Sequence, residues 1–190
     1  MSKTYIVEQK FDKIDFSKNP LTKGEYEICT FTNCDFSNAD LSHFTFSECV
    51  FDACNLSMSK LLNTGFKDIQ FKNSKLMGLY FESCNPFLFK LDFGNCNLNL
   101  SSFYKLNLKK TRFKNTTLHE VDFSESDLTS SVFDGCDLMR ATFKNTNLEK
   151  VDFRKAINYA FDLEENRVKK ALFSKEGVVG LLDKYDIIIE

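Results

Sequence analysis

The chain of 190 residues has no tryptophan, only two prolines and only two histidines. His43 and His119 have no acid or nucleophile partner that the sequence identifies, so it indicates no histidine-based active site. The seven scattered glycines form no phosphate-binding loop. No run of 18 apolar residues is present, which predicts no transmembrane helix. These absences predict a protein that is not an enzyme and does not enter the membrane.

The net charge is also small, at −2, with a pI near 5.8. Such a balance indicates neither strong nucleic-acid attraction nor bulk acidity. Residues 1–10 lack the apolar core of a signal peptide. The cysteine count of seven is odd, which in such a chain favours reduced thiols. We therefore expect a cytoplasmic protein.

What the sequence does have is a large apolar residue at every fifth position, with one interruption. A helix repeats every 3.6 residues and a strand every two, so neither places every fifth residue on one face. A solenoid with five-residue sides does. The repeated positions are Phe11, Phe16, Leu21, Tyr26, Phe31, Phe36, Leu41, Phe46, Phe51, Leu56, Leu61, Phe66, Phe71, Leu76 and Phe81, then Phe93, Leu98, Phe103, Leu108, Phe113, Leu118, Phe123, Leu128, Phe133, Leu138, Phe143, Leu148 and Phe153.

Each repeat reads small, Asp or Asn, Phe or Leu, polar, polar, as in Cys34-Asp-Phe-Ser-Asn. Asp, Asn and Ser beside the apolar residue suit a turn at each corner, because their side chains bond nearby backbone groups. The cysteines occupy the small position, which predicts buried fillers rather than a disulfide framework. Their C-x4-C spacing differs from that of structural zinc sites, so we expect no metal and no cofactor.

These repeats resemble those of the pentapeptide-repeat protein family over residues 11–155. The resemblance implies an all-β solenoid, a right-handed quadrilateral β-helix with four pentapeptides per coil. The resulting 20-residue period places Phe11, Phe31, Phe51 and Phe71 in one column. It places Phe93, Phe113, Phe133 and Phe153 in another. Seven to eight coils are expected.

The resemblance divides the chain into three parts. Residues 1–10 are expected to be an N-terminal lead-in, and residues 11–155 the β-helix. Twelve residues separate Phe81 from Phe93, two more than a multiple of five, so the frame breaks within residues 82–92. We expect a bulge or a skipped corner there, marked by Pro86, with a projecting contact site as the alternative.

Residues 156–190 are expected to form a small helical and strand cap. Asp162-Leu-Glu-Glu resembles a capping box and predicts a helix over 163–173. Ser174 predicts a second helix over 175–184, and residues 187–189 read as a short strand. A solenoid end needs a cover, so the segment either caps its own chain or contacts a second copy. The resemblance to the gyrase-protecting members implies a homodimer, with candidate contacts at Val178, Leu181, Leu182, Ile187 and Ile189.

Charge is the informative surface feature. Residues 24–59 carry six acids and no lysine or arginine, whereas residues 105–114 carry five bases and no acid. The candidate acidic partner surface comprises Glu25, Glu27, Glu48 and Asp52. The candidate basic surface comprises Lys105, Lys109, Lys110, Arg112 and Lys114.

The expected function is that of a rigid protein-binding module. The resemblance to the quinolone-resistance members implies a DNA mimic that binds DNA gyrase, a type II topoisomerase, and alters quinolone susceptibility. The chain departs from those members in its low net charge and in lacking long insertions for loops. Two alternatives stay open: a structural or self-assembling rod, and a weak direct nucleic-acid binder that uses residues 105–114.

Overall fold

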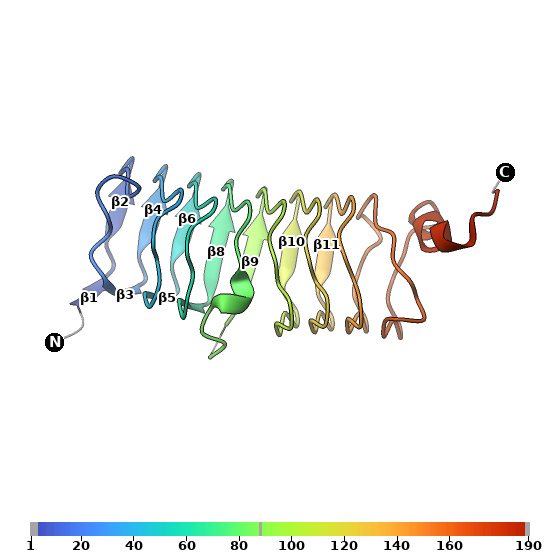
Figure 1. Cartoon of the computed structure of the whole chain (residues 1–190). Helices are drawn as coiled ribbons and strands as arrows, with labels where there is room; N and C mark the ends of the chain where they lie inside the picture. Colours follow the sequence, from blue (N-terminus) through green and yellow to red (C-terminus); the bar gives the residue numbers. More distant parts are fainter. Residues whose placement is uncertain (1–3, 88, 189–190) are drawn as a thin grey trace.

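The chain winds into a parallel β-solenoid, with the two ends of the described chain at opposite ends of its axis (Figure 1). The computed structural model describes residues 4–87 and 89–188. Two parallel sheets run along two sides of the solenoid. The first sheet contains β1 (Thr4–Val7), β3 (Gly24–Glu27), β5 (Thr45–Ser47) and β7 (Gly65–Lys67). The second sheet contains β2 (Lys10–Asp12), β4 (Thr30–Thr32), β6 (Val50–Asp52), β8 (Ile69–Lys72), β9 (Leu91–Gly94), β10 (Arg112–Lys114) and β11 (Val132–Asp134).

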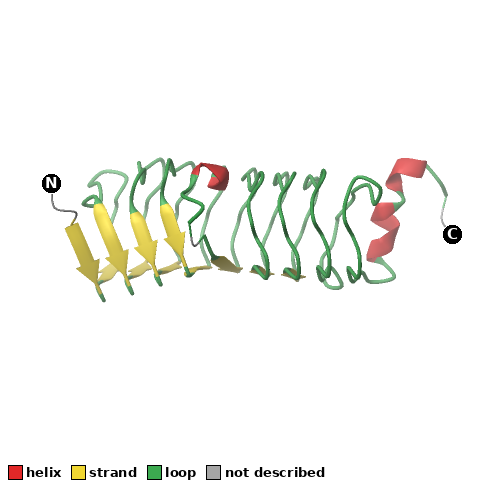
Figure 2. Ribbon diagram, turned by 90° about the horizontal axis from the view of Figure 1, so that it is seen from below, coloured by secondary structure: helices red, strands yellow, loops and turns green. Residues whose placement is uncertain are grey.

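The other sides of each coil carry isolated parallel bridges instead of strands (Figure 2). Asp35 bridges to Asn55 on one such side, and Asp40 bridges to Lys60 on the other. Both bridges join residues 20 apart, so pairing recurs at four places in each coil. β1 lies within the expected lead-in, yet it already pairs with β3 from Thr4↔Gly24 to Val7↔Glu27.

One continuous column of nine stacked phenylalanine rings runs along the core, and a shorter column joins Phe81, Phe103, Phe123 and Phe143. In the longer column, adjacent ring centroids lie 4.7–5.6 Å apart, with planes within 25° of parallel. The nine rings are those of Phe11, Phe31, Phe51, Phe71, Phe93, Phe113, Phe133, Phe153 and Phe173. The expectation of two separate columns was wrong, because Phe71 pairs directly with Phe93 across the frame break.

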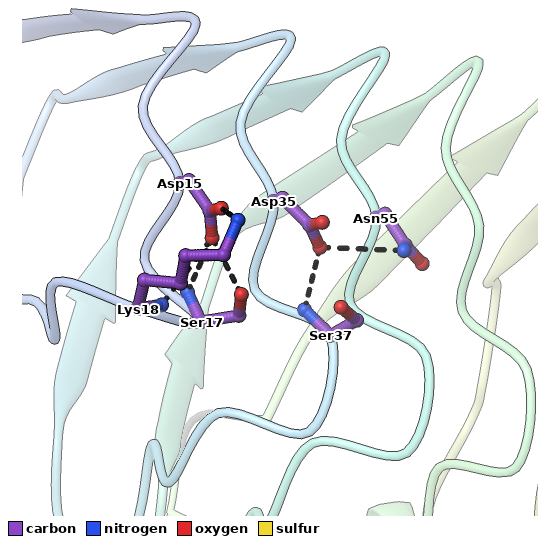
Figure 3. A network of polar contacts seen from close by, with 6 residues as sticks. All are labelled: Asp15, Ser17, Lys18, Asp35, Ser37 and Asn55. Atoms are coloured by element: carbon purple, nitrogen blue, oxygen red, sulfur yellow. Dashed lines mark hydrogen bonds and ion pairs between the residues drawn. The ribbon is translucent and has the colours of Figure 1, made fainter.

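Left-handed residues and short polar side chains make the corners. Non-glycine residues with φ near +55° recur at five-residue intervals, among them Asn33, Asn38 and His43. Beside such a corner the Asp35 carboxylate accepts a 2.8 Å hydrogen bond from the amide of Ser37 (Figure 3). The same carboxylate accepts one from Asn55 of the next coil at 3.3 Å. The expected turn chemistry is therefore confirmed, and it also links neighbouring coils.

The small residues of the repeat point inward and fill the space between rings. All seven cysteines are buried and unpaired. Where Ser or Thr replaces Cys, its hydroxyl can bind a backbone carbonyl, as Ser59 does to Phe36 at 2.7 Å and Thr64 to Leu41 at 2.7 Å. This satisfies a buried polar group that would otherwise destabilise the core.

The frame break takes the form of a local outward bulge. The 3-10 helix η1 (Phe81–Ser83) precedes it. Asn85 still pairs with Gly65 at the regular 20-residue separation, whereas Leu91 pairs with Ile69, 22 residues earlier. The two extra residues therefore lie between Asn85 and Leu91, next to Pro86. The segment projects from the outline of the coils in Figure 1.

The C-terminal segment differs from the expectation. Residues 163–173 form no helix: Arg167 bridges to Asn147 and Leu172 to Asp152, so the solenoid continues beyond Phe153. In place of the helix expected over 175–184, two short 3-10 helices form, η2 (Gly177–Leu181) and η3 (Asp183–Tyr185). Ser174 does accept a hydrogen bond from the amide of Gly177, at 2.9 Å. Residues 187 and 188 form no strand, and Ile189 lies outside the described residues.

Candidate interaction surfaces

Two hollows on the described surface lie near the N-terminal end and beside β11. A hollow of about 420 Å³ lies at the N-terminal end, lined by first-coil residues such as Ile6, Phe11 and Leu21. A second, of about 320 Å³, lies beside β11 and includes Asp134, Asp152 and Arg154. Within residues 4–87 and 89–188, no three metal-ligating side chains gather and no helix is long and apolar enough to span a membrane.

The acidic candidates lie around one corner of the solenoid. Glu25 and Glu27 belong to β3 on the first sheet, and Asp52 belongs to β6 on the second. Glu48 lies at the corner between β5 and β6 and is exposed. Glu27 accepts a hydrogen bond from the Tyr5 hydroxyl. The structure thus brings these four acids to neighbouring coils, although they face two different sides.

Asp52 has a second role in the ladder between coils. Its carboxylate accepts a 2.7 Å hydrogen bond from the side chain of Asn73. Asn73 in turn accepts one from Asn95 at 3.1 Å, and Asn95 accepts one from Asn115 at 3.2 Å. Asp52 is therefore one end of a polar ladder that links four coils, so its substitution affects packing as well as charge.

The basic candidates are divided between two sides and two corners. Arg112 and Lys114 are exposed on β10 of the second sheet, and Lys110 occupies the corner before it. Lys105 and Lys109 instead form ion pairs with acids of the next coil. The charge of residues 105–114 is therefore spread around the solenoid rather than gathered on one face.

The ion pairs of Lys105 and Lys109 also reduce the net positive charge of residues 105–114. Lys105 lies 3.3 Å from Glu125, and Lys109 lies 3.2 Å from Asp127. The Tyr104 hydroxyl donates to Glu125 at 2.8 Å, and this bond, helped by Lys105, lowers the pKa of the Glu125 carboxyl. Both acids stay ionised at neutral pH, so these two lysines contribute little net charge.

The C-terminal candidates fall into two groups. Leu181 is only 3% exposed and packs in the core with Tyr159 and neighbouring side chains, so it caps its own chain. Val178, at 40% exposed, and Ile187, at 55%, face outward, and Leu182 is half-buried. The expectation that Leu181 contacts a second copy was wrong, because its side chain is already covered.

The bulge presents an aromatic ring to solvent. Phe87 is 76% exposed, and its backbone amide donates to the Asn85 side chain at 3.0 Å. Phe89, by contrast, turns inward and packs edge-on against Phe81, with centroids 6.4 Å apart. The spacing signalled a break here, but it did not show which of the inserted residues would project.

His119 and Asp137 form a polar pair that was not predicted from the sequence. His119 Nε2 lies 2.8 Å from Oδ2 of Asp137. The other carboxylate oxygen of Asp137, Oδ1, accepts a hydrogen bond from the side chain of Asn158. The pair is half-buried and bridges neighbouring coils. The two residues are 18 apart in the sequence, close to the 20-residue length of a coil. That separation could have indicated that they lie on adjacent coils.

Two family profiles match this repeat pattern. The profile described as "Pentapeptide repeat region" matches residues 49–123 and 74–153, and "Pentapeptide repeats (8 copies)" matches residues 29–64. These matches together cover more than half of the chain. They agree with the five-residue sides of the solenoid. This is a pentapeptide-repeat protein. No curated protein sequence matches it.

Solved structures of two other proteins share the fold. A trypsin-treated form of QnrB1, a plasmid-mediated fluoroquinolone resistance protein, is 19% identical, with a TM-score of 0.59 over 98% of this chain and 100% of that one. HetL, a pentapeptide repeat protein involved in heterocyst differentiation regulation from the cyanobacterium Nostoc sp. strain PCC 7120, is 15% identical. Its TM-score is 0.67 over 89% of this chain and 86% of that one. At these identities the likeness shows the fold alone.

Proposed function

We propose that this pentapeptide-repeat protein is a non-enzymatic binding module whose rigid outer surface docks onto a protein partner. The observation that carries the proposal is the division of each repeat: the apolar rings, thiols and small hydroxyl groups face inward, and the charged groups face outward. The inward positions build the coil. Specificity is then left to the outward residues, which differ from one coil to the next.

DNA gyrase is the first partner to test. The fold resemblance to QnrB1, a fluoroquinolone resistance protein, supports this choice, as does the acidic corner around Glu48. The assay is DNA supercoiling by gyrase with and without a fluoroquinolone, with this protein titrated in. We expect inhibition of supercoiling or relief of drug-induced cleavage at micromolar protein. No effect at a large excess would contradict gyrase as the partner.

Charge reversal tests which surface carries the interaction. Changing Glu25, Glu27, Glu48 and Asp52 to Lys should abolish the effect on gyrase if the acidic corner imitates DNA. A matched variant changes Glu120, Glu125, Asp134 and Glu149 to Lys and alters the net charge equally on later coils. Circular dichroism checks that both variants remain folded. Loss of activity in both, or in neither, would argue against the acidic corner.

We also propose a homodimer through the exposed apolar residues of the C-terminal segment. Val178 and Ile187 support it, because they lie at the end of the solenoid and face outward. The variant Val178→Asp should give a monomeric mass by light scattering at tens of micromolar without lowering the melting temperature. A monomeric wild-type protein under the same conditions would contradict the dimer.

A further inference from the structure

One corner of the solenoid forms a continuous ridge. At this corner the chain passes from the first sheet to the second, and in eight coils the corner residue is left-handed, with φ between +53° and +62°. The amides of six of them donate to the following coil, as Glu48 does to Lys67 at 2.8 Å and Lys110 to Thr129 at 3.0 Å. The corner ridge comprises Glu8, Ile28, Glu48, Asp68, Lys110, Ser130, Lys150 and Lys170.

The sign of the charge reverses along this ridge. The four N-terminal members include three acids and no base, whereas the four C-terminal members include three lysines and no acid. Six of the eight are exposed, and Asp68 and Ser130 are half-buried. The ridge therefore has an acidic half and a basic half of equal length.

The outward residues on both sides of the corner follow the same division. At the ridge residue, the residue before it and the residue two places after it, the first four coils hold four acids and two lysines; these are Glu8, Glu27, Glu48 and Asp68, with Lys10 and Lys67. At the same three positions the last four coils hold five bases without a described ion pair and two acids; these are Lys110, Arg112, Lys150, Lys169 and Lys170, with Glu149 and Asp152. A sixth base, Lys109, is paired with Asp127. The asymmetry is thus a property of the whole edge.

The break lies at the centre of the ridge. Lys90 occupies the coil between Asp68 and Lys110, and its ammonium is paired with the Asp68 carboxylate. A two-fold axis through this coil, perpendicular to the solenoid axis, places Glu8 opposite Lys170 and Asp68 opposite Lys110. It places Ile28, which is 48% exposed, opposite the aliphatic stem of Lys150. Self-complementarity of this kind defines an isologous interface.

We propose that two copies of this chain associate side by side, in antiparallel orientation, along the corner ridge. Each acidic half faces the basic half of the other copy, and complementary charge sets the register. A parallel arrangement is disfavoured because it brings like charges together. This contact is separate from the C-terminal apolar contact, because it lies along the length of the solenoid and depends on ionic strength.

Sedimentation velocity at low and high salt tests the proposal. At about 100 µM protein, we expect a reversible dimer in about 50 mM salt whose association constant falls at least tenfold in about 500 mM salt, where the Debye length is much shorter. A dimer through the C-terminal apolar residues would not weaken with salt. A monomer in low salt, or a dimer that is insensitive to salt, would overturn the ridge contact.

Charge exchange makes the test specific. One variant carries Glu8→Lys and Asp68→Lys, and the other carries Lys110→Glu and Lys170→Glu, so that each reversed residue faces a reversed partner across the two-fold axis. The backbone accepts these changes, because Glu and Lys already occupy the same left-handed corner position in different coils. Each variant alone should lose the salt-sensitive dimer, and a mixture of the two should recover it as a heterodimer.

A control on the opposite corner completes the experiment. Asn38→Lys with Glu120→Lys adds positive charge at left-handed corner residues away from the ridge. We expect this variant to dimerise like the wild type. Equal loss of association in the control, or no recovery in the mixture of folded ridge variants, would contradict the proposal.

Discussion

At the scale of single residues, the ring column and the buried small side chains stabilise the molecule in different ways. A phenylalanine such as Phe113 contacts rings both above and below it, at 5.1 Å from Phe93 and 4.8 Å from Phe133. A thiol such as Cys54 instead fills a narrow corner and donates to the Phe31 carbonyl at 3.3 Å. Large residues thus set the spacing of the coils, and small ones close the corners.

Truncating one ring of the column should be costly. We expect Phe113→Ala to lower the free energy of unfolding by about 3–5 kcal/mol, because the cavity interrupts a close-packed stack. Phe113→Leu should cost less than about 1.5 kcal/mol, since leucine occupies equivalent inward positions on other sides of the coil. Urea denaturation followed by circular dichroism measures both. The neighbouring Lys114→Ala should change stability by less than about 0.5 kcal/mol.

The buried thiols predict a loss of stability at alkaline pH. Burial raises the pKa of Cys49, Cys54 and Cys136 from 9.0 to about 12. The unfolded chain therefore loses these protons at lower pH than the folded chain does. Their stabilising contribution is complete below about pH 9 and falls as the pH rises toward 12.

The urea midpoint measured between pH 7 and pH 11 checks this expectation. Cys54→Ser is a suitable control, because Ser74 fills the corresponding place in the next coil. This variant should show a smaller decline at high pH than the wild type. A midpoint that does not change above pH 9 would contradict the thiol explanation.

At the scale of elements, the five-residue spacing predicted the sides, corners and break but not the C-terminal segment. The Asp162 side chain does accept a bond from the amide of Glu164, as a helix start requires. No helix follows, because the backbone of Arg167 pairs with the previous coil and Phe173 stacks on Phe153. Val168 and Phe173 lie 15 and 20 residues after Phe153, so they continue its five-residue spacing. This spacing indicated a further coil, but the sequence prediction gave more weight to the capping residues.

The candidate surfaces were less predictable than the fold for a physical reason. Inward residues are constrained by repeated packing, so their spacing appears in the sequence. Outward residues such as Lys105 and Glu125 obey no such rule, and their pairing depends on which side chains meet across adjacent coils. Net charge along the sequence therefore overstated the basic character of residues 105–114.

Removing two residues from the break should restore the regular repeat. Deletion of Pro86 and Phe87 leaves Cys84-Asn85-Leu88-Phe89-Lys90, whose first three residues match those of Cys54-Asn55-Leu56-Ser57-Met58. We expect a folded variant whose melting temperature lies within a few degrees of the wild type. Deletion of Phe87 alone should lower it much more, because one residue too many still displaces every later contact in that coil.

At the scale of the whole molecule, each coil contacts mainly its neighbours, so stability should add up along the axis. Deleting residues 114–133 joins Phe113 to Asp134 and removes one 20-residue period without changing the frame. We expect a shorter protein with the same circular dichroism per residue and a modestly lower melting temperature. Deleting residues 114–130 breaks the frame and should prevent cooperative folding. Thermal melting of the two variants side by side distinguishes them.

The stacking of coils along one axis also determines how the molecule should respond to force. The described ends of the chain lie at opposite ends of the solenoid (Figure 1), and the hydrogen bonds between coils run along the same direction. A pull on the two ends therefore loads one layer at a time, and the chain should peel coil by coil. Each released coil of 20 residues extends to about 66–72 Å. Under load, such a protein should therefore lengthen in equal steps, one for each coil that unfolds.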